Sequence, residues 1–316
     1  MDSTLSILPQ LLINAAIAGS IYALAASGLA LTYGVSRILN FAHGQTMMVG
    51  AYLFLFFTEI LNVETLQEIS ATQNVVSYAQ LLVAGGMALI LAGALGALLF
   101  ALFVAPFAGR NPLLPFVATV AAGKIFENTI AILFGVNVRS ISSNAESYDL
   151  GFGYITQSQI FICISAPLVL GMLALLVNKT ALGRNFRAVQ STPSAASALG
   201  ISIRGTQLKV FVISAILAAF AGILVGYETS LQPTMGASFT VKALAVMVLG
   251  GLGNIWGTII ASYILAAIET VIVGVDFGVY SLPIGYRDAV AFIVLLVVLL
   301  WRPHGVLKRG TSRSSV

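Results

Sequence analysis

The chain has 316 residues, of which 59% are hydrophobic and 8% are charged, and its mean hydropathy is +0.99. A soluble domain cannot bury so much apolar surface, so the composition excludes that class and predicts an all-α polytopic membrane protein with a single transmembrane domain over residues 1–316. The formal net charge of +4 predicts an excess of Lys and Arg in cytoplasmic loops rather than binding to nucleic acid.

Apolar segments of about 20 residues, the length that crosses a bilayer as a helix, recur along the whole chain. We predict eight transmembrane helices, in the segments 8–33, 38–61, 78–104, 114–134, 160–177, 209–227, 255–273 and 288–301. Stripes of small residues at every fourth position let another helix approach closely, either within the chain or in a dimer. One stripe is Ala15, Gly19, Ala23 and Ser27, and the other is Ser214, Ala218, Gly222 and Gly226.

Basic and acidic residues alternate between successive connections. The basic ones are Arg37, Arg110, the loop residues Lys179, Arg184, Arg187 and Arg204, and the tail residues Arg302, Lys308, Arg309 and Arg313. The stretches 63–77 and 136–159 carry Glu64, Glu68, Glu146 and Asp149 against Arg139. Because basic loops stay in the cytoplasm, we expect the amino terminus outside and the carboxyl terminus in the cytoplasm.

Asn40, His43 and Gly44 stand at the start of the second segment. Asn40 can cap the helix, and Gly44 allows another helix to approach closely. No second His, Cys or carboxylate stands at metal-ligand spacing from His43, so we expect a hydrogen-bonded structural residue and no metal site.

Lys124, Glu127 and Asn128 lie three or four residues apart on the fourth segment and share one helical face. An isolated charge within the bilayer is costly, so we expect Lys124 to pair with Glu127. A structural pair and a pair that lines an aqueous path both remain open. Glu228, Lys242 and Glu269 fall near the ends of apolar segments, where interfacial positions are expected.

The loop 178–207 is the one long polar, basic stretch of the chain, and it contains a short helix over residues 193–199. Thr192 can cap that helix through its hydroxyl, Pro193 suits its first position, and Gly200 can take the left-handed turn that ends it. The helix also includes Ser194, Ala195, Ala196 and Leu199. A short capped helix in a loop of a membrane protein indicates a docking site for a partner.

Residues 241–249 form an apolar piece about 14 Å long as a helix, too short to cross about 30 Å of hydrocarbon. We therefore predict a re-entrant half-helix that turns back at Gly250, Gly251 and Gly253, with Asn254 capping the next helix. The helix ends that meet at this turn carry opposite partial charges, which could guide a zwitterion. The alternative is a packing hairpin that closes the bundle.

Three stretches of the sequence resemble a known family. They are Leu31-Thr-Tyr-Gly-Val-Ser-Arg-Ile-Leu-Asn-Phe-Ala-His-Gly-Gln-Thr-Met-Met-Val-Gly-Ala-Tyr52, Lys242-Ala-Leu-Ala-Val-Met-Val-Leu-Gly-Gly-Leu-Gly-Asn254 and Trp301-Arg-Pro-His-Gly-Val-Leu307. Together with Gly183-Arg-Asn-Phe-Arg-Ala-Val189 they resemble the LivH-type permeases of branched-chain amino-acid ABC importers. The family's loop pattern, Glu-Ala-Ala followed by Gly after three residues, matches Ala195, Ala196 and Gly200, with Ser194 in place of Glu.

The resemblance implies a permease of the bacterial inner membrane that pairs with a second, similar permease as a heterodimer. It also implies two cytoplasmic ATPases, which would bind ATP and Mg²⁺, and an external substrate-binding protein. The chain contains no Gly-x-x-x-x-Gly-Lys-Ser/Thr phosphate loop and no catalytic constellation, so we expect no cofactor and no enzymatic activity of its own.

We therefore interpret the chain as the permease of an ATP-driven importer for branched-chain or other hydrophobic amino acids, working by alternating access. A related importer for urea or amides is one alternative. A proton-coupled secondary transporter with Lys124, Glu127 and Glu269 as a relay is another, and a non-transporting scaffold is a third.

Overall fold

The computed structural model describes residues 2–61, 71–107, 111, 113–141, 147–149, 151, 153–274 and 287–301. Several charges used to predict the topology lie outside these residues: Glu64, Glu68, Arg110, Glu146, Arg302, Lys308, Arg309 and Arg313. The part of the Trp301–Leu307 segment that follows Trp301 lies outside them too.

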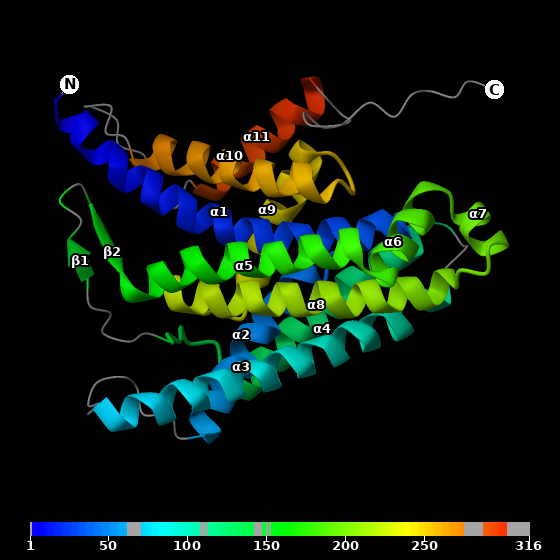
Figure 1. Cartoon of the computed structure of the whole chain (residues 1–316), viewed down its shortest axis with the longest axis horizontal. Coiled ribbons are helices and arrows are strands. Elements are labelled where there is room, and N and C mark those ends of the chain that lie inside the picture. Colours follow the sequence, from blue (N-terminus) through cyan, green and yellow to red (C-terminus); the bar gives the residue numbers. More distant parts are fainter. Residues whose placement is uncertain are drawn as a thin grey trace.

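The described chain is a bundle of helices with one small β-hairpin (Figure 1). The helices are α1 (Asp2–Ser36), α2 (His43–Ile60), α3 (Ala71–Leu99), α4 (Leu113–Phe134), α5 (Gln157–Lys179), α6 (Ala181–Ser191), α7 (Pro193–Ala198), α8 (Ile203–Glu228), α9 (Met235–Gly250), α10 (Ile255–Gly274) and α11 (Arg287–Trp301). A π-helical turn (Phe100–Val104) and a 3-10 turn (Ala105–Phe107) prolong α3. The antiparallel strands are β1 (Ser147–Asp149) and β2 (Tyr154–Thr156).

Six of the described helices are long and apolar enough to cross a membrane by length and composition: α1, α3, α4, α5, α8 and α10. The all-α polytopic class is therefore confirmed, whereas the count of eight spans stays a prediction. The second predicted segment is shorter than expected because α2 begins only at His43. Before it, Arg37 adopts a left-handed φ of 55°, which ends α1 and starts a non-helical connection.

The two ends of the bundle carry different structures. At one end, which we call the hairpin end, Gln10 of α1 bonds both main-chain groups of Tyr154, accepting from its amide at 2.7 Å and donating to its carbonyl at 3.1 Å. The opposite end, which we call the loop end, carries α6 and α7 (Figure 1). Helix α1 runs between the two ends.

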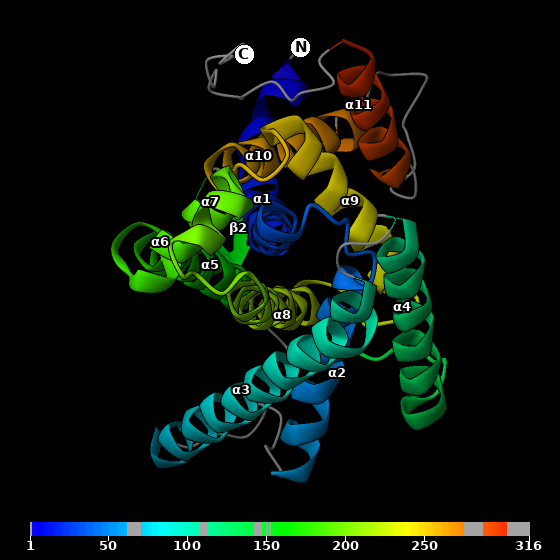
Figure 2. The ribbon, with the colours of Figure 1, turned by 90° about the vertical axis from the view of Figure 1, so that its right-hand side faces the viewer.

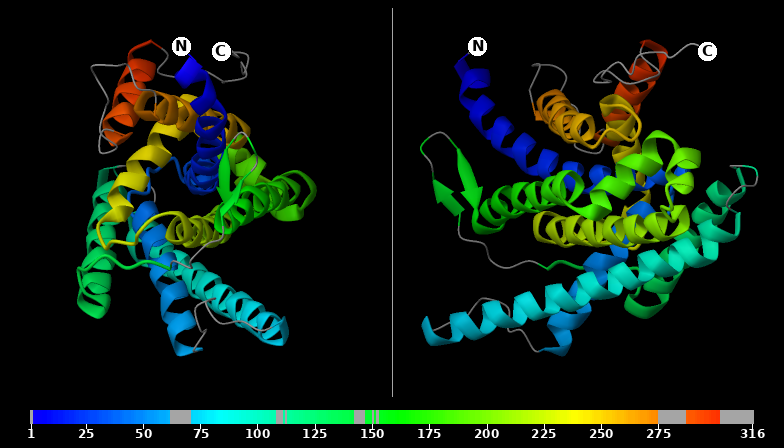
Figure 3. Two further views of the ribbon diagram at one scale, coloured as in Figure 1. Left: turned by 90° about the vertical axis from the view of Figure 1, so that its left-hand side faces the viewer. Right: turned by 45° about the vertical axis from the view of Figure 1, so that its right-hand side comes forward.

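Helix α1 lies near the centre of the bundle, surrounded by α5, α8, α9 and α10 (Figure 2). In its most apolar stretch 89% of the residues are buried, against 39% in α3, which lies on the outside of the bundle in both views of Figure 3. The small-residue stripes are used within the chain. A Cβ on Gly19 would lie 2.6 Å from Cδ1 of Tyr263 in α10, and one on Gly222 would overlap the Met47 carbonyl in α2.

A helix is present where the half-helix is predicted, but it differs in length and in position, and its re-entrant course stays a prediction. Helix α9 has 16 residues, about 24 Å, rather than the nine expected. It begins beside Gly44 at the start of α2, at mid-depth in the bundle, and runs to the loop end. Its glycine turn therefore lies at the loop end and not inside the bundle. The apolar run 241–249 gives too short a helix because it leaves out Gly236, Ser238 and Thr240. These residues are small or polar, but they are helical.

Candidate functional site

The loop 178–207 contains more helix than the sequence predicts, because the eleven-residue helix α6 precedes α7. Thr180 caps α6 by accepting from the amide of Gly183 at 3.2 Å. Gly183, Phe186 and Val189 are buried, and their three-residue spacing places them on one face. That spacing, with Thr180 before it, is the sequence signal for this helix, which the predicted loop over 178–207 did not include.

Helix α7 occupies Pro193–Ala198, close to the predicted helix, with Pro193 at its start. Gly200 has a φ of 80°, so the left-handed turn after the helix is confirmed. The hydroxyl cap predicted for Thr192 is wrong: Thr192 precedes the helix in an extended conformation, and its side chain makes no capping bond. Pro193 has no amide hydrogen, so the first turn has one donor fewer to satisfy.

The side chains of α7 divide into an inner and an outer set. Ala196 is buried, and its carbonyl accepts from the amide of Ile201 at 3.0 Å. Ser194 and Ala195 are exposed, and the Leu199 side chain, which follows the helix, is 80% exposed. The exposed side chains of Ser194, Ala195 and Leu199 therefore form the outer surface of this short segment.

The start of α2 is a buried polar junction. His43 is 2% exposed, and its Nε2 lies 2.7 Å from the carbonyl oxygen of Ala25 in α1. Its Nδ1 lies 3.4 Å from the hydroxyl of Ser214 in α8, so the ring joins three helices. Asn40 accepts from the amide of Ala42 at 3.1 Å, but Ala42 is the residue that caps α2. The predicted Asn40 cap is therefore displaced into the turn before the helix.

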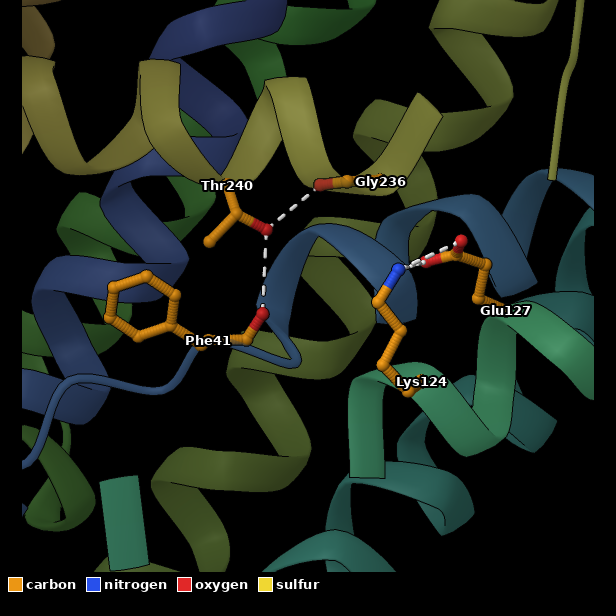
Figure 4. A network of polar contacts seen from close by, with 5 residues as sticks. All are labelled: Phe41, Lys124, Glu127, Gly236 and Thr240. Carbon is orange, nitrogen blue, oxygen red and sulfur yellow. Dashed lines mark hydrogen bonds and ion pairs between the residues drawn. The ribbon is translucent and has the colours of Figure 1, made fainter. Parts of the chain in front are cut away.

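Gly44 is where α2 and α9 cross. A Cβ at this position would overlap the carbonyl oxygen of Gly236 and the hydroxyl of Thr240, so the predicted close approach is present. The Thr240 hydroxyl accepts from the amide of Gly44 at 3.1 Å and lies 2.8 Å from the Gly236 carbonyl and 3.5 Å from the Phe41 carbonyl (Figure 4). The amino ends of two helices, which carry partial positive charge, thus meet at mid-depth.

Lys124 and Glu127 form the predicted ion pair on α4, with Nζ 2.8 Å from Oε2 (Figure 4). The Lys124 side chain is 62% exposed and that of Glu127 is 14% exposed, and Asn128 is exposed as well. Gly123, on the same helix, packs against the Gln45 side chain of α2. The charged pair therefore belongs to the face of α4 beside the α2 junction and remains accessible from outside this chain.

The glycine turn between α9 and α10 is tightly packed. Gly251 and Gly253 have φ values of 94° and 78°, as a reversal requires, and Asn254 caps α10 by accepting from the amide of Gly257 at 3.2 Å. A Cβ on Gly250 would overlap the main chain of Gly257. This packing is consistent with the hairpin that closes the bundle, and the guiding role of the turn stays a prediction.

Lys242 and Glu269 are the residues whose positions the sequence misjudged. Both were expected at the interface, and that expectation is wrong: they are 8% and 1% exposed. Lys242 Nζ lies 2.8 Å from Oδ1 of Asp288, 3.1 Å from the Tyr22 hydroxyl and 3.7 Å from Oε2 of Glu269. Tyr22 donates to the same Glu269 oxygen at 2.8 Å. This Lys242 network joins α1, α9, α10 and α11.

A comparison with protein families matches residues 11–299 to the model described as "branched-chain amino acid transport system / permease component". The chain belongs to this family. The permease is therefore a transport component and not an enzyme, as the sequence predicted.

Curated relatives match the permease over nearly its whole length. It is 30% identical over 308 residues to the high-affinity branched-chain amino acid transport system permease protein BraD of Pseudomonas aeruginosa, with 95% of each chain covered. It is 29% identical over 313 residues to the corresponding LivH of Salmonella typhimurium, again with 95% of each chain covered. No solved structure matches the permease.

Within the described residues, the permease has no group of three or more His, Cys, Asp or Glu side chains that could hold a metal ion. The residues singled out from the sequence fall instead into three places: the α6–α7 loop, the junction of α2 and α9 with the nearby α4 pair, and the glycine turn.

Proposed function

We propose that this permease carries branched-chain or other hydrophobic amino acids across the bacterial inner membrane as the transmembrane subunit of an ATP-binding-cassette importer. The observation that carries the proposal is the family match over residues 11–299, together with relatives of that printed activity over 95% of their length. The chain lacks a phosphate loop of its own, so ATP and Mg²⁺ would be bound by partner ATPases.

We propose that α7 is the docking element for one of two cytoplasmic ATPases. The support is the exposed Leu199 beside a buried Ala196, on a loop that α6 packs firmly against the bundle. The shape of this element, and no charged side chain, would then contact the ATPase. The residues that give it this shape are Thr192, Pro193, Ser194, Ala195 and Gly200. The loop end would then face the cytoplasm and the hairpin end an external binding protein.

We propose that the substrate path follows the accessible face of α4 and the junction of α2 with α9. Lys124 stands in the middle of a helix long enough to span the membrane, yet it is 62% exposed. Contact with lipid would be costly for this ammonium group, so an aqueous path or a second permease would cover it. The same path would be lined or supported by Asn40, His43, Gly44, Glu127 and Asn128.

A proton-coupled transporter with Lys124, Glu127 and Glu269 as a relay is less well supported. Lys124 is paired with Glu127 on α4, whereas Glu269 is bonded to Tyr22 and Lys242 in a separate network. A relay would need these groups in one chain of hydrogen bonds.

The test is uptake of radiolabelled leucine by proteoliposomes that hold the complex purified through a tag on this permease, with the binding protein outside. Uptake should require ATP and ignore an imposed pH gradient. Leu199→Glu, which places a charge on the exposed face of α7, should lower uptake about tenfold or more, equivalent to about 1.4 kcal/mol or more.

Leu199→Met keeps an apolar side chain of similar volume and should behave like the wild type. Uptake driven by the pH gradient without ATP would overturn the proposal. Uptake of labelled urea but not leucine would reassign the substrate to the amides.

A further inference from the structure

The last turn of α6 is tied to two other elements through one residue. Gln190 Nε2 donates to the carbonyl of Gly253, in the turn between α9 and α10, at 2.8 Å. The Gln190 carbonyl accepts from Nη2 of Arg37, after the end of α1, at 2.9 Å. Gln190 is therefore a direct contact between the segment that leads into α7 and the turn that ends α9.

This contact is close-packed as well as hydrogen-bonded. A Cβ on Gly253 would lie 3.2 Å from Nε2 of Gln190, and one on Gly34 of α1 would lie 3.3 Å from the same atom. Phe186, one turn earlier on α6, is buried against Gly34, and Gln190 leaves little free space beside Gly253, so we expect a displacement of α6 to move the glycine turn.

Helix α9 is held at two further points beyond the turn. Lys242, near the middle of α9, is fixed by Asp288, Tyr22 and Glu269 from three other helices. The amino end of α9 rests on Gly44 at the α2 junction. A rigid helix with a load at one end and an anchor near its middle tilts, so its far end moves in the opposite direction.

We propose that Gln190 transmits the displacement of α7 to the glycine turn, and that α9 then tilts about Lys242 and moves its amino end against Gly44. Gln190 is a positioning residue in this scheme, because it touches neither substrate nor nucleotide. The proposal rests on the proposed function, since it takes α7 as the element on which the ATPase acts.

The test compares Gln190→Glu with Gln207→Glu in the purified complex. Gln207 of α8 is a matched control: it is also half-buried at the loop end, and its Nε2 donates to a main-chain carbonyl, that of Val35, at 3.1 Å. In both variants a carboxylate oxygen replaces the donor at unchanged length, so the hydrogen bond is lost. Leucine uptake and ATP hydrolysis are measured on the same proteoliposomes.

Gln190→Glu should still hydrolyse ATP but import about tenfold less leucine per ATP, because the motion of α7 no longer reaches the glycine turn. Gln207→Glu should keep the wild-type ratio. Gln190→Met, which lacks the donor but adds no charge, should repeat the loss and covers the case in which Glu prevents folding.

An unchanged ratio in Gln190→Glu and Gln190→Met, with an active wild type, would refute the transmission role. Equal losses in the Gln190 and Gln207 variants would refute it too, since any disturbance of the loop end would then suffice. A wild-type complex without ATP-driven uptake would instead refute the proposed function.

Discussion

Lys242 connects four helices through one ammonium group in the apolar interior. Its partners Tyr22, Glu269 and Asp288 come from α1, α10 and α11, and its own helix is α9. The Lys242 ammonium group also lies near the Tyr22 ring, and its Nζ is 5.3 Å from the ring centroid. Such a network costs desolvation when it forms, but the removal of one member leaves a buried charge without compensation.

Replacement of this lysine tests how far the fold depends on the network. Lys242→Met should lower the free energy of unfolding by about 3 kcal/mol, because Glu269 loses its cation in a buried site. Lys124→Met is the control: the Lys124 side chain is 62% exposed, and its change should cost less than about 1 kcal/mol. Thermal unfolding in detergent measures both, and equal midpoints in the two variants would contradict the structural role.

At the scale of elements, the crossing of α2 and α9 depends on the absence of two side chains. Gly44 and Gly236 face each other so closely that a Cβ on either would meet the main chain of the opposite helix. Small residues at such crossings allow helices in a membrane to pack without a hydrophobic driving force. The crossing also brings the amino ends of both helices together.

A single methyl group should separate these helices. Gly44→Ala should cost about 2 kcal/mol of stability because the new Cβ overlaps Gly236 and Thr240. Gly86→Ala in α3, where no atom lies within 4 Å of the added Cβ, should stabilise by up to about 1 kcal/mol through helix propensity. Thermal unfolding in detergent measures the stability of both variants. A Gly44→Ala variant as stable as Gly86→Ala would refute the tight crossing.

At the scale of the whole molecule, we predict that the hairpin end and the loop end face opposite sides of the membrane. Ser147 in β1 and Ser197 in α7 are both exposed and belong to opposite ends. The charge pattern of the sequence predicts that the loop end faces the cytoplasm.

Labelling of single cysteines with a membrane-impermeant maleimide tests this orientation in a Cys163→Ser background. Ser147→Cys should react in intact spheroplasts, and Ser197→Cys should react only after permeabilisation. The opposite pattern would invert the topology and remove α7 from the reach of a cytoplasmic ATPase. Leucine uptake confirms that each variant is assembled.

Much of the fold followed from properties that each residue or short segment carries alone. Apolar length predicted the spanning helices, and the dihedral preferences of Pro193, Gly200, Gly251 and Gly253 predicted the ends of α7 and the turn after α9. The spacing of Gly183, Phe186 and Val189 after Thr180 also indicates helix α6, although the prediction places this segment in a loop. These features are local because sterics and hydrogen bonding act within a few residues.

The burial of Lys242 and the contact of Gln190 with Gly253 could not be read in the same way. The partners lie 220 residues apart for Lys242 and Tyr22 and 63 apart for Gln190 and Gly253. A lysine near the end of an apolar run is equally suited to an interface or to a buried ion pair, and only the packing of distant helices selects between them. The link between the loop end and α9 arises for the same reason, because the folded bundle brings the Gln190 side chain to a backbone carbonyl that carries no signal in the sequence.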